Sequence, residues 1–351
     1  MNTRLTSLRE FLTSRQLDGI LINKPENCRY FSGFTGSSGI LLITKQAARL
    51  ITDFRYIEQA SKEATGFDII RHGSNLYETV RAEISDQSLN RVGFESSFVT
   101  YTEYQQLVNL AVDFVPVILD ELRMIKDASE LVFIRQAVNL ADMAFTHILS
   151  FIKPGVTENA IALELEYHMR KNGAENAAFD TIVASGARSA LPHGRASEKV
   201  IEVGDLVTMD FGALYKGYHS DITRTVSVGR ASTKQREIYK LVLSAQLAGA
   251  SAIRPGMCAS DVDNVSRKII SDAGYANFFG HGLGHGVGLA VHEEPRLSPS
   301  CNTVLSSGMV ITVEPGVYLP DWGGVRIEDT VVVTADGVEI LTASSKEFIE
   351  L

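Results

Sequence analysis

"LVTMDFGALYKGYHSDITRTVSV", residues 206–228, alternates apolar and polar side chains on both sides of the turn-forming "YKGY". This period of two predicts two antiparallel strands, because successive side chains of a strand point to opposite faces. Asp210 falls on the face opposite Phe211, and Asp221 falls opposite Ile222 on the returning strand. The predicted hairpin therefore carries two carboxylates on its less apolar face.

A second pair of stretches, "MVITVEPGVY" (309–318) and "GVRIEDTVVV" (324–333), has the same alternation. Glu314 and Glu328 fall opposite the apolar positions, and Arg326 shares the face of Glu328. Taken singly, each acid is equally consistent with an exposed strand residue. Clustering four carboxylates in apolar strands is prohibitive without compensating positive charge, which a pair of divalent cations supplies. Two hairpins of matching parity therefore favour a metal site.

Helical periodicity of the apolar residues precedes each hairpin. The helices are expected at about 129–150 and 157–172 before strands 206–215 and 219–228, and at about 232–253 and 260–273 before strands 309–319 and 324–334. This order, run twice, predicts an α+β domain with two pseudo-related halves around an antiparallel sheet. Residues 1–120 alternate short helical patterns with apolar runs such as "GILLIT", which predicts an α/β domain. We place the boundary within 120–127, giving domains of residues 1–122 and 123–351.

The composition is that of a globular protein, with 45% hydrophobic and 21% charged residues in a chain of 351. No apolar run approaches the roughly 20 residues of a membrane span, and the first residues do not resemble a secretory signal. A net charge of −9 argues against nucleic acid or an anionic membrane surface as partner. The cysteines (Cys28, Cys258 and Cys301) form no CxxC pair, so we expect a reducing, cytoplasmic location.

"HGLGHGVGLAVHEEP", residues 281–295, supplies the imidazoles. His281 and His285 have the spacing of a two-histidine zinc helix, but glycine occupies four of the seven positions from 282 to 288. Each interior glycine costs a helix about 1 kcal/mol relative to alanine, so we do not expect a helix here. One imidazole with four carboxylates is an oxygen-rich ligand set, which favours Mn²⁺ or Co²⁺, with Zn²⁺ as the next candidate.

Several motifs together resemble those of the dinuclear-metal "pita-bread" peptidases, and within them the prolidase and aminopeptidase P branch. They are "MDFGALYKGYHSDITRT", "HGLGHGVGLAVHE", "ITVEPGVY" and "GVRIEDT", with "YFSGFTGSSG" and "DFRYIEQA" near the amino terminus. The resemblance covers nearly the whole chain. It implies an N-terminal accessory domain, a pita-bread catalytic domain, two divalent metal ions per chain and a homodimer formed through the N-terminal domain.

The resemblance implies a metal-binding role for five residues, all of which are present. In the implied arrangement Asp210 would bind one metal ion, His285 and Glu314 would bind the other, and Asp221 and Glu328 would bridge the two. The resemblance further implies that a hydroxide between the metals would attack the scissile carbonyl, since metal binding lowers the pKa of water toward neutrality. Glu314 is implied as the general base that moves the proton.

Residues around the metals are implied to contact the substrate. His292 stabilises the oxyanion, and His193 is a further substrate contact. His281 matches a position that either contacts substrate or lies behind the ligands. Arg296 resembles an arginine that clamps the proline carboxylate, for which a guanidinium fork is well suited. Arg326 either orients Glu328 or holds substrate.

Other residues near the motifs have plainer interpretations. His219 shares the face of Asp221 but is interpreted as a histidine near the turn that binds no metal, and Asp329 has the wrong parity for the site. Phe179, Tyr215 and Tyr218 are equally consistent with a pocket wall and with the core.

The sequence thus indicates a metallopeptidase that cleaves the bond before proline, which lacks an N–H and carries a rigid ring. Arg296 and the short chain favour a dipeptidase (prolidase) acting on small proline-containing peptides. An aminopeptidase P-like or broader aminopeptidase stays open. The rival from another class is a non-catalytic peptide-binding module on the same fold, against which the intact ligand set argues. The same ligand set argues against a metal-free, creatinase-like hydrolase.

Overall fold

The computed structural model describes residues 3–108 and 112–351. The chain divides into two compact units, residues 1–123 and 124–351, each with its own sheets and apolar core. Among the described helices, none is long and apolar enough to cross a membrane.

The first unit contains a mixed six-stranded sheet with the order β4-β3-β2-β1-β5-β6. β1, β5 and β6 run parallel, whereas β2 pairs antiparallel with both β1 and β3. The strands are β1 (Gly19–Ile22), β2 (Ile40–Thr44), β3 (Ala48–Thr52), β4 (Asp68–Arg71), β5 (Arg91–Glu95) and β6 (Asp113–Val117). The α/β prediction is therefore confirmed for this part of the chain, with the "GILLIT" run forming β2.

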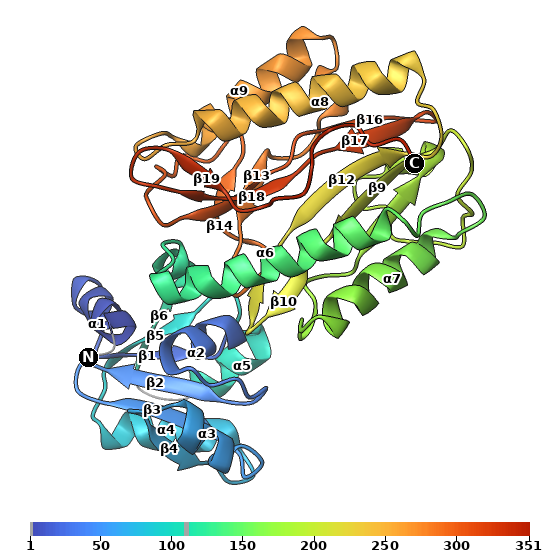
Figure 1. Ribbon diagram of the computed structural model, residues 1–351. Coiled ribbons are helices and arrows are strands. Elements are labelled where there is room, and N and C mark those ends of the chain that lie inside the picture. The colour runs from blue at the N-terminus through green and yellow to red at the C-terminus, as the bar shows by residue number, and fades with distance from the viewer. Residues whose placement is uncertain (1–2, 109–111) are drawn as a thin grey trace. The chain divides into compact units, whose positions relative to one another are not determined.

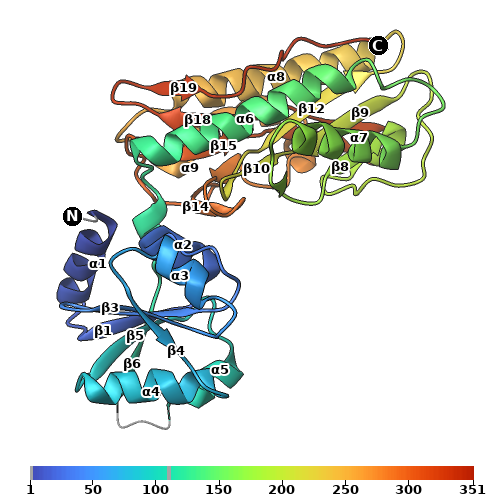
Figure 2. The same ribbon diagram turned by 60° about the horizontal axis from the view of Figure 1, so that its bottom comes forward.

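Helices cover both faces of this sheet (Figure 2). On one side lie α1 (Thr3–Ser14), α2 (Pro25–Ser32) and α3 (Ile57–Glu63), and on the other α4 (Leu76–Asp86) and α5 (Tyr101–Leu107). Helical spacing places Leu5, Leu8 and Leu12 of α1 on one buried stripe. Burial of each such leucine contributes about 1.5–3 kcal/mol. A short 3₁₀ helix, Asp120–Arg123, ends the unit.

Two helix pairs flank the sheets of the second unit (Figure 1). They are α6 (Ala128–Ile148) with α7 (Glu158–Lys171), and α8 (Thr233–Ala252) with α9 (Ala259–Asp272). All four were predicted, and they end within a few residues of the predicted bounds. A capping box begins α6, in which Asp127 accepts from the backbone N–H of Ser129 and Glu130. Each pair packs on its own apolar cluster, α6 and α7 against β9 and β12, and α8 and α9 against strands of the carboxyl-terminal half.

The strands of the second unit are short and pair antiparallel. They are β7 (Asn176–Ala177), β8 (Ile182–Ser185), β9 (Leu206–Phe211), β10 (Ala213–Tyr215), β11 (Tyr218–His219), β12 (Ile222–Ser227), β13 (Gly284–Gly286), β14 (Glu293–Leu297), β15 (Val310–Val313), β16 (Gly316–Leu319), β17 (Gly323–Arg326), β18 (Asp329–Val333) and β19 (Val338–Ile340). The sheets have the orders β12-β9-β8, β11-β10-β7, β14-β13-β15-β18-β19 and β16-β17.

The four long strands that the sequence predicts are each broken in two, which corrects the prediction. The breaks lie at Gly212, at Ser220–Asp221, at Glu314–Pro315 and at Ile327–Glu328. A Cβ on Gly212 would lie 1.8 Å from the carbonyl oxygen of Ser220, so the first hairpin pinches at this point. Pro315 has no N–H for a ladder, and the N–H of Glu328 donates to Thr223 of the other hairpin at 3.1 Å. The strands therefore break where the two hairpins meet.

Candidate active site

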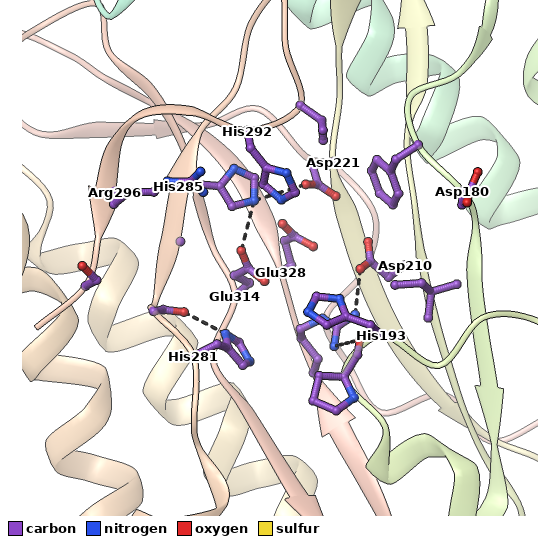
Figure 3. A pocket seen from close by; sticks show the side chains of 18 of the residues that line it. Asp180, His193, Asp210, Asp221, His281, His285, His292, Arg296, Glu314 and Glu328 are labelled. Carbon is purple, nitrogen blue, oxygen red and sulfur yellow. Dashed lines mark hydrogen bonds and ion pairs between the residues drawn. The ribbon is translucent and has the colours of Figure 1, made fainter. Parts of the chain in front are cut away.

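A cavity of about 600 Å³ lies in the second unit, and every residue that the sequence predicts for the site lines it. Figure 3 shows these side chains converging from both halves of the unit. The lining residues are Phe179, Asp180, Ile182, Pro192, His193, Arg195, Asp210, Asp221, His281, Gly282, Gly284, His285, Val291, His292, Arg296, Ser298, Glu314, Arg326 and Glu328.

The strand breaks bring the four carboxylates together. Asp210 is on β9, Asp221 directly precedes β12, Glu314 directly follows β15, and Glu328 lies between β17 and β18. Because β9 and β12 pair with Asp210 opposite Thr223, the two aspartates come from neighbouring strands. Asp221 and Glu328 are only 5% and 1% exposed. Although the strands are broken, the four acids stay on the common side that the alternation predicts, and all four line one cavity.

Three carboxylate oxygens in this cluster are buried and accept no hydrogen bond from the described residues. They are Asp210 Oδ1, Asp221 Oδ1 and Glu328 Oε1. Burial raises the pKa of the Asp221 carboxyl well above its ordinary value, and the neighbouring Glu328 and Asp210 charges raise it further. Burial and the Glu314 charge likewise raise the pKa of Glu328. Buried carboxylate oxygens that lack a hydrogen-bond donor are suited to bind divalent cations, because the cations supply the positive charge that the cluster needs.

His285 adds an imidazole to the carboxylates. Its Nδ1 lies 3.0 Å from the carbonyl oxygen of Gly286, to which it can only donate, so the neutral ring leaves a lone pair on Nε2. Nε2 lies 3.3 Å from Glu314 Oε1 and 3.6 Å from Asp221 Oδ2. Ligand atoms of Asp221, His285 and Glu328 lie within 4.8 Å of one another, close enough to share one ion. The tautomer and the distances both suit His285 as a metal ligand.

Glycine is required around His285 because the strands pack without room for side chains. A Cβ on Gly284 would lie 2.0 Å from the carbonyl oxygen of Thr312, and a Cβ on Gly286 would lie 2.3 Å from that of Glu294. The expectation of no helix is confirmed, since His285 lies in β13. The N–H of His285 donates to Thr312 Oγ1, which in turn donates to Glu314 Oε1. Close packing of the strands at Gly284 and Gly286, together with the hydrogen bonds through Thr312, thus fixes the position of the His285 imidazole relative to Glu314.

The ionisation of Glu314 differs from that of its neighbours. Burial raises the pKa of the Glu314 carboxyl, but a hydrogen bond from His285, and the positive charge of that ring when it is protonated, outweigh burial and lower the pKa to about 2. His292 packs against His285 with ring centroids 4.4 Å apart. Burial and the His285 charge lower the pKa of His292 to about 4, so this imidazole is neutral near pH 7. A neutral imidazole beside the cluster is a hydrogen-bond donor that adds no charge.

Arg326 contacts Asp210 directly and Glu328 through Thr223. Its Nη2 lies 2.7 Å from Asp210 Oδ2, and its Nε donates to Thr223 Oγ1 at 3.0 Å. Thr223 Oγ1 donates to Glu328 Oε2 at 2.7 Å, so the arginine orients Glu328 through a hydroxyl. Of the two roles considered for Arg326, the geometry favours orientation of the carboxylates.

Tyr318 is a member of this cluster that sequence reasoning missed. Its oxygen accepts from Arg326 Nη1 at 2.9 Å, and its hydroxyl lies 2.9 Å from His281 Nε2. His281 Nδ1 is 2.8 Å from the carbonyl oxygen of Gly282, so the neutral ring accepts the Tyr318 proton at Nε2. Tyr318 has the parity of Glu314 on the far side of Pro315, a signal that was available but could not be separated from core packing. Thr223 has the strand parity of Asp221, a pattern that does not by itself indicate its contact with Glu328.

The remaining predictions separate into two groups. Phe179 lines the cavity, whereas Tyr215 and Tyr218 pack against Phe133 outside it. His219 is not among the lining residues, and its Nδ1 lies 3.1 Å from the carbonyl oxygen of Gly288. Asp180 and Arg195, which were not predicted, form an exposed ion pair of 2.9 Å at the cavity wall.

Comparison with models of known protein families shows which family the chain belongs to. The model of metallopeptidase family M24 matches residues 133–335, and that of the Creatinase/Prolidase N-terminal domain matches residues 4–125. The chain belongs to metallopeptidase family M24, a family of hydrolases. The expected fold class, an α/β N-terminal domain followed by a pita-bread catalytic domain, is thereby confirmed.

Individual relatives align over almost the whole chain. The Xaa-Pro dipeptidase of Pyrococcus furiosus is 42% identical, covering 99% of this chain and 100% of the relative. A solved structure of an Xaa-Pro dipeptidase from Bacillus anthracis is 48% identical with a TM-score of 0.97, over 99% of both chains. That of an X-Pro aminopeptidase from Thermotoga maritima is 39% identical with a TM-score of 0.91, over 99% of this chain and 100% of the other.

Proposed function

We propose that this protein is an Xaa-Pro dipeptidase that hydrolyses the peptide bond before a carboxyl-terminal proline. The observation that carries the proposal is the cluster of four carboxylates and His285, in which three buried oxygens accept no hydrogen bond from the described residues. Arg296 lines the same cavity. Relatives along the full chain include proteins named Xaa-Pro dipeptidase, which supports the same substrate class.

Asp210 would hold one divalent cation and His285 and Glu314 a second, with Asp221 and Glu328 shared between them. Divalent cations supply the positive charge that polarises a carbonyl and brings the pKa of water near neutrality. Four carboxylates to one imidazole favour Mn²⁺ or Co²⁺ over Zn²⁺. The orphaned oxygens on Asp210, Asp221 and Glu328 support this assignment.

The protein's own residues move the proton and hold the reacting carbonyl. Glu314, whose pKa lies below its ordinary value, is ionised at neutral pH and accepts the proton of the attacking water as general base. His292, neutral at that pH, donates to the oxygen of the carbonyl as negative charge develops there. His193 contacts the substrate from the facing wall, and His281, held by Tyr318, lines the same cavity.

Arg296 is the residue that we assign to the proline carboxylate. No carboxylate within the described residues forms an ion pair with its guanidinium, whereas Arg195 in the same cavity is paired with Asp180. Figure 3 shows Arg296 beside His285, on the side of the cluster away from Asp180. An unpaired guanidinium at this place favours a dipeptide, whose proline carries the free carboxylate.

An aminopeptidase acting before proline in longer peptides is the second candidate, favoured by the similarity to the Thermotoga maritima structure. Two further alternatives would use the same fold. A broader aminopeptidase would turn over peptides, whereas a non-catalytic peptide-binding module would not. We further propose that residues 1–122 are an accessory domain and 123–351 the catalytic domain, supported by the two compact units. A homodimer formed through the accessory domain and a cytoplasmic location complete the proposal, the latter supported by three free cysteines.

The test compares Ala-Pro with Ala-Pro-Ala for the wild type and for Arg296→Met. We expect the substitution to lower kcat/KM for Ala-Pro about 30- to 100-fold, the value of a charge-assisted contact, through a raised KM. Cleavage of Ala-Pro-Ala should change little, because its proline carries no carboxylate.

The matched control is Arg195→Gln, which removes an arginine of the same cavity whose charge is already paired. It should change kcat/KM less than about threefold. A wild type that prefers Ala-Pro-Ala would move the assignment to the aminopeptidase. An Arg296→Met enzyme with unaltered KM for Ala-Pro would remove Arg296 as the clamp.

A further inference from the structure

His193 lies in a segment, residues 186–198, that has little regular structure of its own. Between β8 and β9 the chain forms only the 3₁₀ helix Gly186–Ala190, and His193 itself is exposed. Figure 3 nevertheless shows its imidazole among the side chains of the cavity. An exposed side chain on an irregular segment needs anchors elsewhere if it is to meet a substrate in one position.

The anchor is Glu158, the first residue of α7, which is fully buried. Its Oε1 accepts from the N–H and the hydroxyl of Ser185 at 2.7 and 2.8 Å. Its Oε2 accepts from Ser197 Oγ at 2.6 Å and from Arg188 Nε at 3.1 Å. One carboxylate thus holds the residue before the segment, a residue inside it and a residue near its end.

Further contacts close the segment around this anchor. Arg188 Nη2 donates to the carbonyl oxygen of Arg195 at 2.7 Å, and the backbone of Arg195 forms an antiparallel bridge with Ile182. Gly194, next to His193, is packed so tightly that a Cβ would lie 2.8 Å from that of Ala184. The segment is therefore held on both sides of His193. Glu158 contacts Ser185, Arg188 and Ser197 directly, and it is linked to Arg195 through Arg188.

We infer that Glu158 is a positioning residue for catalysis, which fixes the His193 segment over the cavity and acts through His193 without touching substrate. The inference rests on the proposed function, because it concerns the contact of His193 with the substrate. A carboxylate is required because both oxygens accept. Glutamine at 158 keeps an acceptor for Ser185 but presents an N–H₂ to the guanidinium of Arg188.

The test is a double-mutant cycle of Glu158→Gln with His193→Ala, measured on Ala-Pro with the metal-loaded enzyme. With His193 present, Glu158→Gln should lower kcat/KM about tenfold, since a displacement of order 1 Å can cost more than that. With His193→Ala already made, the same change should cost less than about twofold. Metal content should equal that of the wild type in every variant. Glu166→Gln, on the same helix, is the matched control and should leave kcat/KM unchanged.

Ser197→Ala removes one tether without touching the buried carboxylate. It should show the same coupling to His193 with a smaller loss, about threefold, and it serves if Glu158→Gln does not fold. Equal losses with and without His193, or loss of metal, would overturn the inference. Hydrogen exchange over residues 186–198 is a readout that does not depend on turnover, and it should become faster in Glu158→Gln. A wild type inactive on Xaa-Pro peptides would end the proposed function, while unchanged exchange would end the positioning role.

Discussion

Asp221→Asn is expected to remove nearly all peptidase activity, lowering kcat for Ala-Pro by about a thousandfold or more, because several kcal/mol of electrostatic stabilisation depend on the bound cations. Asn has the shape of Asp but lacks its charge, and Asp221 Oδ2 lies 3.6 Å from His285 Nε2, at the centre of the proposed site. Metal analysis of the purified variant should find fewer than the two ions per chain that we propose for the wild type.

The stability of the metal-free variant separates loss of function from loss of folding. Burial raises the pKa of Asp221 in the folded protein, so its ionised form destabilises the metal-free fold at any pH above the ordinary pKa of Asp. Asn removes that cost, and the metal-free variant should unfold at a temperature equal to or above that of the metal-free wild type. Exposed Asp261, changed to Asn, is the control and should leave metal content and kcat unaltered. Full metal content with full activity in Asp221→Asn would contradict the assignment.

Asp329→Ala is expected to lower the free energy of unfolding by about 3–5 kcal/mol, the cost of leaving buried charge without its partner. Asp329 is fully buried, and its carboxylate accepts from Arg224 Nη2 at 2.8 Å and from Gln246 Nε2 at 2.9 Å. Lys346 forms a second ion pair with it. Alanine would leave the guanidinium of Arg224, which is 1% exposed, without a counter-charge.

Urea unfolding of the metal-free protein measures this effect apart from any change in metal affinity. Asp336→Ala is the control, since Asp336 is exposed in the turn before β19 and should cost less than about 0.5 kcal/mol. A loss below about 1 kcal/mol for Asp329→Ala would mean that water reaches Arg224 on relaxation. The buried ion pair would then be redundant.

Strand parity made the carboxylate cluster predictable. The alternation in residues 206–228 and 309–333 placed Asp210, Asp221, Glu314 and Glu328 on the less apolar faces, and all four line one cavity. Parity is local, because it needs only the period of a strand. The breaks in these strands were not predicted, although Pro315 was visible, since the Glu328 N–H finds its acceptor on Thr223 of the other hairpin.

Residues that act through distant partners were beyond sequence reasoning. Tyr318 joins His281 to Arg326, and Glu158 joins Ser185 to Ser197, contacts that only the folded chain brings together. Glu158 in particular begins a helix, where acids are common for the helix dipole alone. Nothing in its local pattern separates that ordinary role from an anchor of the His193 segment.

The most direct test of the account is hydrolysis of Ala-Pro by wild-type protein stripped of metal with a chelator and then given Mn²⁺, Co²⁺ or Zn²⁺ in turn. We predict no turnover in the stripped protein, and recovery that saturates at two equivalents of Mn²⁺ or Co²⁺ per chain. Undiminished turnover in the stripped protein would contradict the metal site. No turnover on Ala-Pro or Ala-Pro-Ala with any of the three metals would contradict the peptidase and favour a peptide-binding module.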